Sequence, residues 1–327
     1  MRKRVWIGLG LAAIVGGIWV FNAGWRVGPA EDAELRLIAH RGMHQTYSRE
    51  GLDNDTCTAE RIFEPTHAFL ENTLASMEAA FAYGADVVEL DVHPTTDGRF
   101  AVMHDWTVDC RTEGTGVTRE HDMASLRQLD IGHGYTADGG ASFPFRGHGV
   151  GLMPELGEVF AAFPEGKFLV NFKSNEAREG TMLAERLAQA PEWRPLVWGV
   201  YGGDPPTAAA AEAVPGLASW TRRSLFDCLT RYAGMGWAGL MPDACRDTVV
   251  MVPVNMAPWL WGWPNLFQAR MREAGTAVVL IGPFESGDTG SSGIDSLDLL
   301  AQVPEGFDGY VWTNRIEVIG PALGREE

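Results

Sequence analysis

Positive charge is scarce in this chain. Its 327 residues include 26 lysines and arginines against 43 aspartates and glutamates, so the formal net charge is −17. A nucleic-acid-binding protein needs a basic face, and this balance therefore argues against a nucleic-acid partner. It also argues against electrostatic adhesion to anionic lipid. With 46% hydrophobic and 21% charged residues, the chain can form one sizeable core.

Long hydrophobic runs are also missing, except at the N-terminus. There the basic residues Met1–Arg4 precede a run to residue 23 that is almost wholly apolar. About 20 apolar residues can span a bilayer, so we expect residues 1–23 to be a membrane anchor or signal segment, followed by a tether over residues 24–34. No small-x-small cleavage site stands out after Phe21, which favours an uncleaved anchor. Because the basic flank stays in the cytoplasm, the rest of the chain is expected on the exported side, periplasmic or extracellular.

Cysteine is rare too, with four residues at Cys57, Cys110, Cys228 and Cys245. An even number in an exported protein suggests disulfides, whereas four reduced core cysteines would be expected in a cytosolic chain. Three pairings are possible. We favour Cys57–Cys110 because both residues follow strands whose loops should share one face, and Cys228–Cys245 because that pair is local.

From residue 35 onwards, short apolar segments alternate with amphipathic ones. This alternation predicts a parallel α/β fold, and its eight or nine strands favour a closed TIM (β/α)8 barrel over an open sheet. A helix is expected over Asn72–Tyr83, with an asparagine cap. The expected strands are Leu35–Ala39, Asp86–Val92, Arg99–Met103, Lys167–Phe172, Leu196–Tyr201, Leu217–Thr221, Val249–Val254, Thr276–Ile281 and Gly309–Thr313.

Two carboxylates stand close together in the most informative stretch, residues 84–105. Glu89 and Asp91 lie two apart on one predicted strand, so their side chains point to the same face. Adjacent buried carboxylates repel each other unless a cation lies between them, and oxygen ligands suit Ca²⁺ or Mg²⁺. His104 ends the next predicted strand and can carry a proton near neutral pH. Taken alone, this stretch could also be a polar sheet edge with a solvated histidine.

Further polar side chains fall at the ends of neighbouring strands. His40 and Arg41 close the first predicted strand, and Asn171 and Lys173 close the fourth. The active site of an α/β barrel lies at the C-terminal strand ends, so these residues should meet the stretch 84–105 on one rim. The two cationic side chains could neutralise a phosphodiester, and two histidines allow one general base and one general acid. The set suits phosphoryl transfer.

These residues belong to an ordered run of motifs that resembles the glycerophosphodiester phosphodiesterase family. The resemblance covers roughly residues 35–320, which we take as the barrel domain. Its motifs are Ile38–Gly42, Glu71–Thr73, Gly84–Val92, Thr95–Gly98, Val102–Asp105 and Gly309–Arg315.

The resemblance implies a TIM barrel, a divalent metal cofactor and hydrolysis of a small-molecule or lipid-derived phosphodiester to glycerol phosphate and an alcohol. It implies catalysis through His40 and His104. It also implies that Glu89 and Asp91 are metal ligands, with Glu71 as a supporting residue near the site.

The chain departs from the family pattern on the fourth strand. The family usually has Glu-x-Lys there, with the glutamate as third metal ligand, and this chain has an asparagine at position 171. An amide oxygen can bind Ca²⁺ or Mg²⁺, but it brings no charge. Asn171 is therefore the candidate third ligand, and Arg41 and Lys173 are the candidate phosphate-binding residues.

A second departure is the polar segment Met43–Leu70, which is too long for an ordinary connection and is expected to be a functional loop over the mouth of the barrel. A Cys57–Cys110 bridge would pin this loop in place. We then expect loss of the bridge to raise the KM for substrate.

Two alternatives stay open. One is a phospholipase D-like relative, which forms a cyclic phosphate by internal attack of a substrate hydroxyl. The other is a barrel that binds phosphodiesters or a partner without turnover. Asn171 favours the non-catalytic alternative, whereas the presence of both histidines weighs against it.

Overall fold

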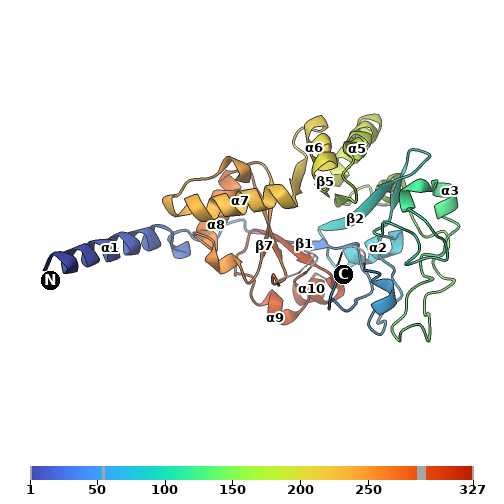
Figure 1. Ribbon diagram of the computed structural model, residues 1–327, viewed down its shortest axis with the longest axis horizontal. Coiled ribbons are helices and arrows are strands. Elements are labelled where there is room, and N and C mark those ends of the chain that lie inside the picture. Colours follow the sequence, from blue (N-terminus) through green and yellow to red (C-terminus); the bar gives the residue numbers. More distant parts are fainter. Residues whose placement is uncertain (1, 54–55, 286–291, 326–327) are drawn as a thin grey trace.

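Eight parallel strands form the centre of the molecule (Figure 1). The computed structural model describes residues 2–53, 56–285 and 292–325 and places these strands in the order β6-β5-β4-β2-β1-β9-β8-β7. Thr248 Oγ1, just before β7, donates to the carbonyl oxygen of Ser219 in β6 at 2.9 Å. The first and last strands of this order, β6 and β7, therefore lie side by side and the sheet closes on itself. The sheet is thus the predicted TIM-like barrel. The bounds are β1 Leu35–Ala39, β2 Val87–Pro94, β4 Phe168–Phe172, β5 Val197–Gly202, β6 Ala218–Thr221, β7 Val249–Pro253, β8 Ala277–Ile281 and β9 Gly309–Thr313.

Helices cover the outside of the barrel, one after each of its strands. Successive strand residues face opposite sides, so in β1 Leu37 packs in the main core with the helices while Ile38 faces the interior. The interior is rich in aromatic side chains, among them Trp220, Tyr310 and Trp312. The covering helices are α2 Leu74–Ala82, α4 Leu156–Ala162, α5 Ala177–Gln189, α6 Asp204–Ala213, α7 Arg222–Met235, α8 Asn265–Glu273, α9 Leu297–Leu300 and α10 Ile316–Ala322.

The third predicted strand lies outside the barrel. β3, Phe100–Val102, pairs antiparallel with the far end of β2. We expected the strand before His104 to be a barrel neighbour, and this expectation is wrong because the turn at Thr95–Gly98 reverses the chain. The returning strand brings the backbone N–H of Met103 to the carbonyl oxygen of Asp91 at 3.1 Å. His104 therefore reaches the acidic residues through a hairpin that extends beyond the barrel and folds back.

Two long segments pack together beyond the C-terminal strand ends, on the right of Figure 1. Side chains from residues 47–70 and 101–153 form a second small core, which includes Tyr47, Leu70 and Tyr135. The short helix α3, Met123–Leu126, belongs to this part of the chain. The segment Met43–Leu70 is therefore held by packing against its neighbour as well as by covalent bonds.

Two disulfides join the four cysteines in the favoured pairing. Cys57 and Cys110 are bonded across 53 residues of sequence and connect the two long segments. Cys228 and Cys245 are bonded across 17 residues and connect α7 to the short helix before β7. Disulfides persist in oxidising compartments, so the presence of two disulfides indicates an extracytoplasmic domain.

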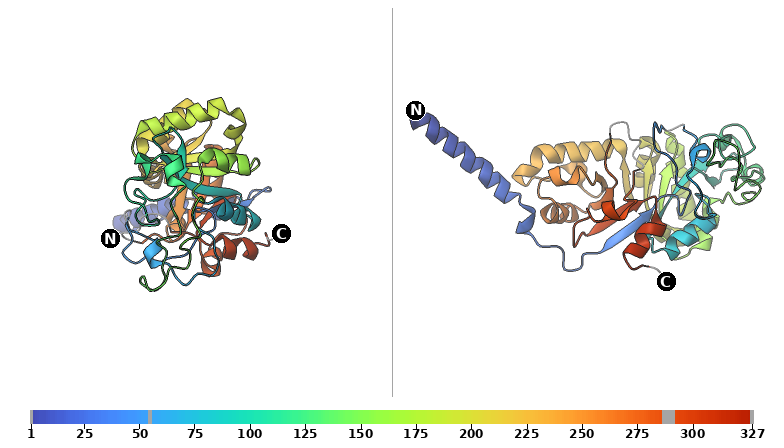
Figure 2. Two further views of the ribbon diagram at one scale, coloured as in Figure 1. Left: turned by 90° about the vertical axis from the view of Figure 1, so that its right-hand side faces the viewer. Right: turned by 90° about the horizontal axis from the view of Figure 1, so that it is seen from below.

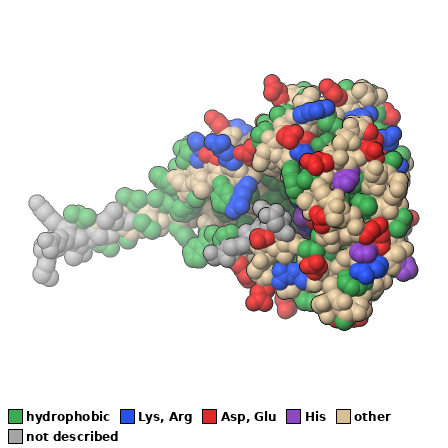
Figure 3. Space-filling model, turned by 45° about the vertical axis from the view of Figure 1, so that its right-hand side comes forward, with side chains coloured by type: hydrophobic (Ala, Val, Ile, Leu, Met, Phe, Trp, Pro, Cys, Tyr) green, Lys and Arg blue, Asp and Glu red, His purple; other side chains and the backbone are tan. Residues whose placement is uncertain are grey.

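The N-terminal helix α1, Arg2–Phe21, extends away from the barrel (Figure 2). For positions 2–5, 8 and 11 only the backbone is described, so the basic side chains expected at Met1–Arg4 lie outside the described residues. Hydrophobic side chains follow the described part of the helix (Figure 3). Among the described residues, no helix combines the length and the hydropathy needed to cross a bilayer. The helix base is fixed by Asn22, which donates to the carbonyl oxygen of Trp237 at 2.8 Å and accepts from Arg270 at 3.0 Å.

Candidate active site

His40 lies directly after β1 and is buried against the end of β9. Its Nδ1 is 2.6 Å from Oδ1 of Asn314. The amide of Asn314 is oriented by Asp295, which accepts from both its side-chain and backbone nitrogens. Asn314 therefore presents its oxygen to the ring, so Nδ1 of His40 carries the hydrogen and Nε2 carries the lone pair. Nε2 lies 3.8 Å from Oε2 of Glu89.

His104 is oriented in the same way by a charged partner. Its Nδ1 lies 2.8 Å from Oδ1 of Asp105, which makes Nε2 the free nitrogen here too. Burial lowers the pKa of both His40 and His104 well below the ordinary value, and the charge of Arg41 lowers each further. Both imidazoles are therefore neutral at neutral pH and able to accept a proton at Nε2.

The two carboxylates of β2 are completely buried and carry different charges. Glu89 accepts from the hydroxyl of Tyr201 at 2.6 Å and from the backbone N–H of Arg41 at 3.1 Å. Burial, reinforced by the charge of Asp91, raises the pKa of Glu89 to about 8. Burial would also raise the pKa of Asp91, but Lys173 and other nearby cationic groups hold it well below its usual range. Asp91 is thus the ionised member of the pair.

Asp91 is the residue on which the predicted site residues converge. Its carboxylate oxygens lie 3.3 Å from Nε of Arg41 and 3.4 Å from Nζ of Lys173. It also accepts from the side-chain amides of Asn72 at 3.0 Å and Asn171 at 2.9 Å. Asp91 and Asn171 are register partners on β2 and β4, which explains their contact. The structure therefore brings the predicted rim residues together.

The contact with Asn72 corrects the predicted helix cap. The cap of α2 is Thr73, which exchanges hydrogen bonds with Ser76, and Asn72 has a left-handed backbone with a φ of 59°. This conformation directs the amide of Asn72 to Asp91, where it both donates to the carboxylate and accepts from the backbone N–H at 3.2 Å. An asparagine that suits a helix start is used here to position a carboxylate.

Glu71 lies between two arginines. It accepts from Nη1 of Arg41 at 3.0 Å and lies 3.2 Å from Nη2 of Arg111. Arg41 is buried and is paired with Glu71 as well as Asp91, whereas the Lys173 side chain is 20% exposed. Of the two candidate phosphate-binding residues, Lys173 is therefore the more accessible. Glu71 holds the Arg41 side chain in place through this contact.

The donor set is compatible with a hard divalent cation. The described residues contain no group of three or more His, Cys, Asp and Glu side chains placed to hold a metal, which agrees with the asparagine at position 171. Glu89, Asp91 and the amide of Asn171 are hard donors, and two adjacent buried carboxylates are stabilised by a shared cation. The raised pKa of Glu89 shows how costly the pair is when both members are charged. The residues present therefore fit such an ion.

Sequence reasoning missed several residues that hold this site together, although most of them lie within the quoted motifs. Asn72 follows Glu71, Asp105 follows His104, and Asn314 follows the last strand. The motifs include these positions, but they do not predict which residues the side chains contact. Tyr201 and Arg111 carried no local signal, and their roles depend on contacts between distant parts of the chain.

An eight-stranded parallel barrel with two oriented imidazoles and two buried carboxylates at its strand ends defines a TIM-barrel protein equipped for acid–base chemistry. Residues 40–193 match the model of the glycerophosphoryl diester phosphodiesterase family. Over this stretch, which is just under half of the chain, the sequence matches the glycerophosphodiester phosphodiesterase family.

Two curated relatives illustrate the similarity. The chain is 36% identical over 113 residues to a glycerophosphodiester phosphodiesterase of Caldanaerobacter subterraneus, which covers 35% of this chain and 42% of that protein. It is 33% identical over 114 residues to one of Bacillus subtilis, covering 34% and 38% respectively. The aligned stretch thus spans less than half the length of either relative.

Solved structures support the fold over most of the chain. A glycerophosphoryl diester phosphodiesterase domain of Mycobacterium tuberculosis superposes with a TM-score of 0.61 at 16% identity, covering 89% of this chain and 99% of that one. A phosphodiesterase of Oleispira antarctica, solved with the product sn-glycerol-3-phosphate, superposes with a TM-score of 0.52 at 19% identity, covering 88% and 96%. At these identities the likeness establishes the barrel fold.

Proposed function

We propose that this protein hydrolyses glycerophosphodiesters to glycerol phosphate and an alcohol. The observation that carries the proposal is the pair His40 and His104, each held through Nδ1 so that Nε2 is available, close to the ionised Asp91. The activity in the names of the two bacterial relatives supports the same reaction, as does the product bound in the Oleispira structure.

The reaction requires two proton transfers, and the site supplies two groups for them. An oxygen nucleophile attacks phosphorus and loses its proton to one imidazole, while the bond from phosphorus to the leaving oxygen breaks and that oxygen gains a proton from the other. One imidazole must be protonated for this, and an anionic phosphodiester beside it favours the charged form. Lys173, the more accessible cation, contacts the phosphodiester, and Arg41 contributes positive charge from behind Asp91.

The proposed cofactor is a divalent cation, Ca²⁺ or Mg²⁺, because the family is typically dependent on one. Glu89, Asp91 and the amide oxygen of Asn171 would hold it. When bound, it would neutralise charge on the phosphoryl oxygens. Asn171 brings no charge to this set, so the two carboxylates would supply all of the negative charge around the ion.

The test is a hydrolysis assay with the full chain and a panel of glycerophosphodiesters that carry choline, ethanolamine, inositol or glycerol. We expect turnover that stops in excess chelator and returns with added Ca²⁺ or Mg²⁺. Phosphorus NMR of the products distinguishes glycerol phosphate from a cyclic phosphate, which would identify the phospholipase D-like alternative. Phosphodiester binding without turnover would instead support the non-catalytic barrel.

We also propose that residues 1–23 attach the barrel to a membrane, with the catalytic domain on the periplasmic or extracellular side. The side chains of Ile14 and Trp19 are 60% and 64% exposed on α1 although they are apolar. The two disulfides support an oxidising compartment for the barrel. Membrane fractionation of the full chain, compared with a chain that begins at residue 24, tests this: the full chain should sediment with membranes and the shortened chain should not.

A further inference from the structure

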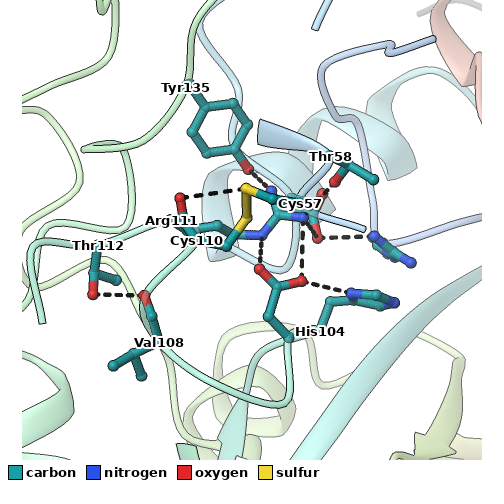
Figure 4. Close-up of a disulfide and its surroundings, with 11 residues drawn as sticks. Cys57, Thr58, His104, Val108, Cys110, Arg111, Thr112 and Tyr135 are labelled. Carbon is teal, nitrogen blue, oxygen red and sulfur yellow. Dashed lines mark hydrogen bonds and ion pairs between the residues drawn. A yellow bond between two sulfur atoms is a disulfide. The ribbon is translucent and has the colours of Figure 1, made fainter. Parts of the chain in front are cut away.

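The Cys57–Cys110 disulfide lies next to a chain of polar contacts that ends at His104 (Figure 4). The residues that follow the two cysteines, Thr58 and Arg111, touch each other, with Nη2 of Arg111 donating to Oγ1 of Thr58 at 2.7 Å. The disulfide thus joins two segments at the point where their next side chains meet.

Arg111 is linked to His104 through Asp105. Its Nε lies 2.8 Å from Oδ2 of Asp105, and the other oxygen of Asp105 lies 2.8 Å from Nδ1 of His104. The Arg111 side chain is only 2% exposed, and it also donates to the hydroxyl of Tyr135 at 2.5 Å and pairs with Glu71. These partners on several sides restrict the orientation of the guanidinium, which in turn holds the carboxylate of Asp105.

Building on the proposed hydrolase activity, we propose that the Cys57–Cys110 disulfide is a positioning device for His104. It holds Thr58 against Arg111, and Arg111 in turn holds Asp105 in the orientation that fixes the imidazole ring. Thr58 and Arg111 are positioning residues, because each acts on His104 through Asp105. The disulfide therefore controls turnover rather than the width of the substrate pocket.

This role differs from the one that the sequence suggested, in which the bridge pins a loop over the mouth and its loss raises KM. The contact of Thr58 with Arg111 places the bridge behind His104. The sulfur of Cys57 also contacts the carbonyl oxygen of Cys110 at 3.6 Å, next to the backbone of Arg111. Without the disulfide, the two cysteines are joined only by the chain between them, over a sequence separation of 53. A connection of that length does not hold Thr58 against Arg111.

The experiment compares two disulfide-free variants of the full chain. Cys57→Ser/Cys110→Ser should lower kcat roughly 10- to 100-fold with KM within about twofold, since a misplaced acid–base group loses part of its ~100- to 10,000-fold effect. Cys228→Ser/Cys245→Ser removes the other bridge and should keep kcat within about twofold of the wild type while lowering the midpoint of thermal unfolding.

Two further variants keep the Cys57–Cys110 bridge intact, so the proposal stays testable even if the first double variant does not fold. Thr58→Val removes the hydroxyl that Arg111 contacts and should lower kcat several-fold. Arg111→Lys should retain more activity than Arg111→Met, because it keeps a positive charge near Asp105. A fall in kcat should again occur without a matching rise in KM.

Proton NMR of the Nδ1 hydrogen of His104 gives a readout that does not depend on turnover. We expect a downfield resonance in the wild type and in Cys228→Ser/Cys245→Ser, and its loss in Cys57→Ser/Cys110→Ser. The proposal is wrong if the resonance survives in that variant, if KM rises with kcat unchanged, or if both double variants lose kcat equally. An inactive wild type with the expected resonance pattern would overturn the proposed function and leave the positioning of His104 supported.

Discussion

The hydroxyl of Tyr201 donates to Oε1 of Glu89 at 2.6 Å, from the end of β5 to the middle of β2. The Tyr201 ring is stacked on Trp220, with centroids 5.0 Å apart, so its direction is set by packing. Burial raises the pKa of Tyr201 well above its usual value, which keeps the hydroxyl a donor. Tyr201 is not itself a proposed metal ligand, but it holds one carboxylate oxygen of Glu89, which is.

Tyr201→Phe should weaken binding of Ca²⁺ or Mg²⁺ by ~10- to 100-fold, the usual cost of losing a partner that orients a metal ligand. The ring and its stacking stay, so the fold should be preserved. Isothermal titration calorimetry of the chelator-stripped protein measures the effect. Tyr310→Phe is the matched control, because Tyr310 also packs in the barrel interior but its hydroxyl contacts Trp198 and Arg36. Equal affinities in the two variants would show that Tyr201 does not orient the ligand.

His40→Ala and His104→Ala should each reduce kcat by ~100- to 10,000-fold, because each removes a group that we propose transfers a proton. Both changes leave the hydrophobic side chains of the core in place, so both variants should fold. Initial rates with the best substrate of the panel, together with circular dichroism, check both points. His148→Ala is the control at an exposed histidine. Near-wild-type turnover in either test variant would remove that histidine from the mechanism.

The stability of the metal-free protein should depend on the titration of Glu89. Its pKa is about 8 in the folded protein against an ordinary 4.5, so between these values the folded state binds more protons than the unfolded state. The stabilisation is therefore complete below pH 4.5 and is lost as the pH rises through 8. The buried His40 and His104 have lowered pKa values, so their effect on stability has the opposite sign. Below about pH 6.5 the unfolded state binds more protons at these two residues than the folded state does, and the fold loses stability as the pH falls. The window from pH 6.5 to 8 isolates Glu89.

In this window, and in excess chelator, the wild type should lose roughly 1.4 kcal/mol of unfolding free energy per pH unit relative to Glu89→Gln. Glutamine resembles the protonated acid and does not titrate. Urea unfolding at pH 6.5, 7.2 and 8 measures the difference. Glu78→Gln, on the exposed face of α2, should follow the wild type. Parallel curves for the wild type and Glu89→Gln would show that Glu89 is ionised throughout.

The barrel and the rim residues could be predicted from sequence because their signals are local. Alternation within strands marks the buried faces, and the spacing of Glu89 and Asp91 places both on one face. The hairpin that carries His104 was misplaced because a strand of three residues has the same pattern whether it joins a barrel or turns back on its neighbour. The partner of His40 could not be found either, because Asn314 is 274 positions away and only the closing of β1 on β9 brings them together.

Asn171→Glu should tighten binding of the divalent cation. Asn171 lies opposite Asp91 in the register of β2 and β4, and its amide donates to Asp91 at 2.9 Å. A carboxylate there would give the ion a third charged ligand, as in the usual Glu-x-Lys pattern of the family. Without metal, the same carboxylate would repel Asp91. The variant should therefore unfold at a lower temperature than the wild type in chelator, and gain more from added Ca²⁺ or Mg²⁺.

Asn175→Glu is the control for this change, since it makes the same substitution four residues further on, at an exposed position. Thermal unfolding with and without metal, and calorimetric titration of each variant, give the comparison. Asn171→Glu should show the larger metal-induced rise in unfolding temperature and the lower dissociation constant. If both variants respond to metal as the wild type does, position 171 does not face the ion. The two carboxylates of β2 would then have to bind it with other partners.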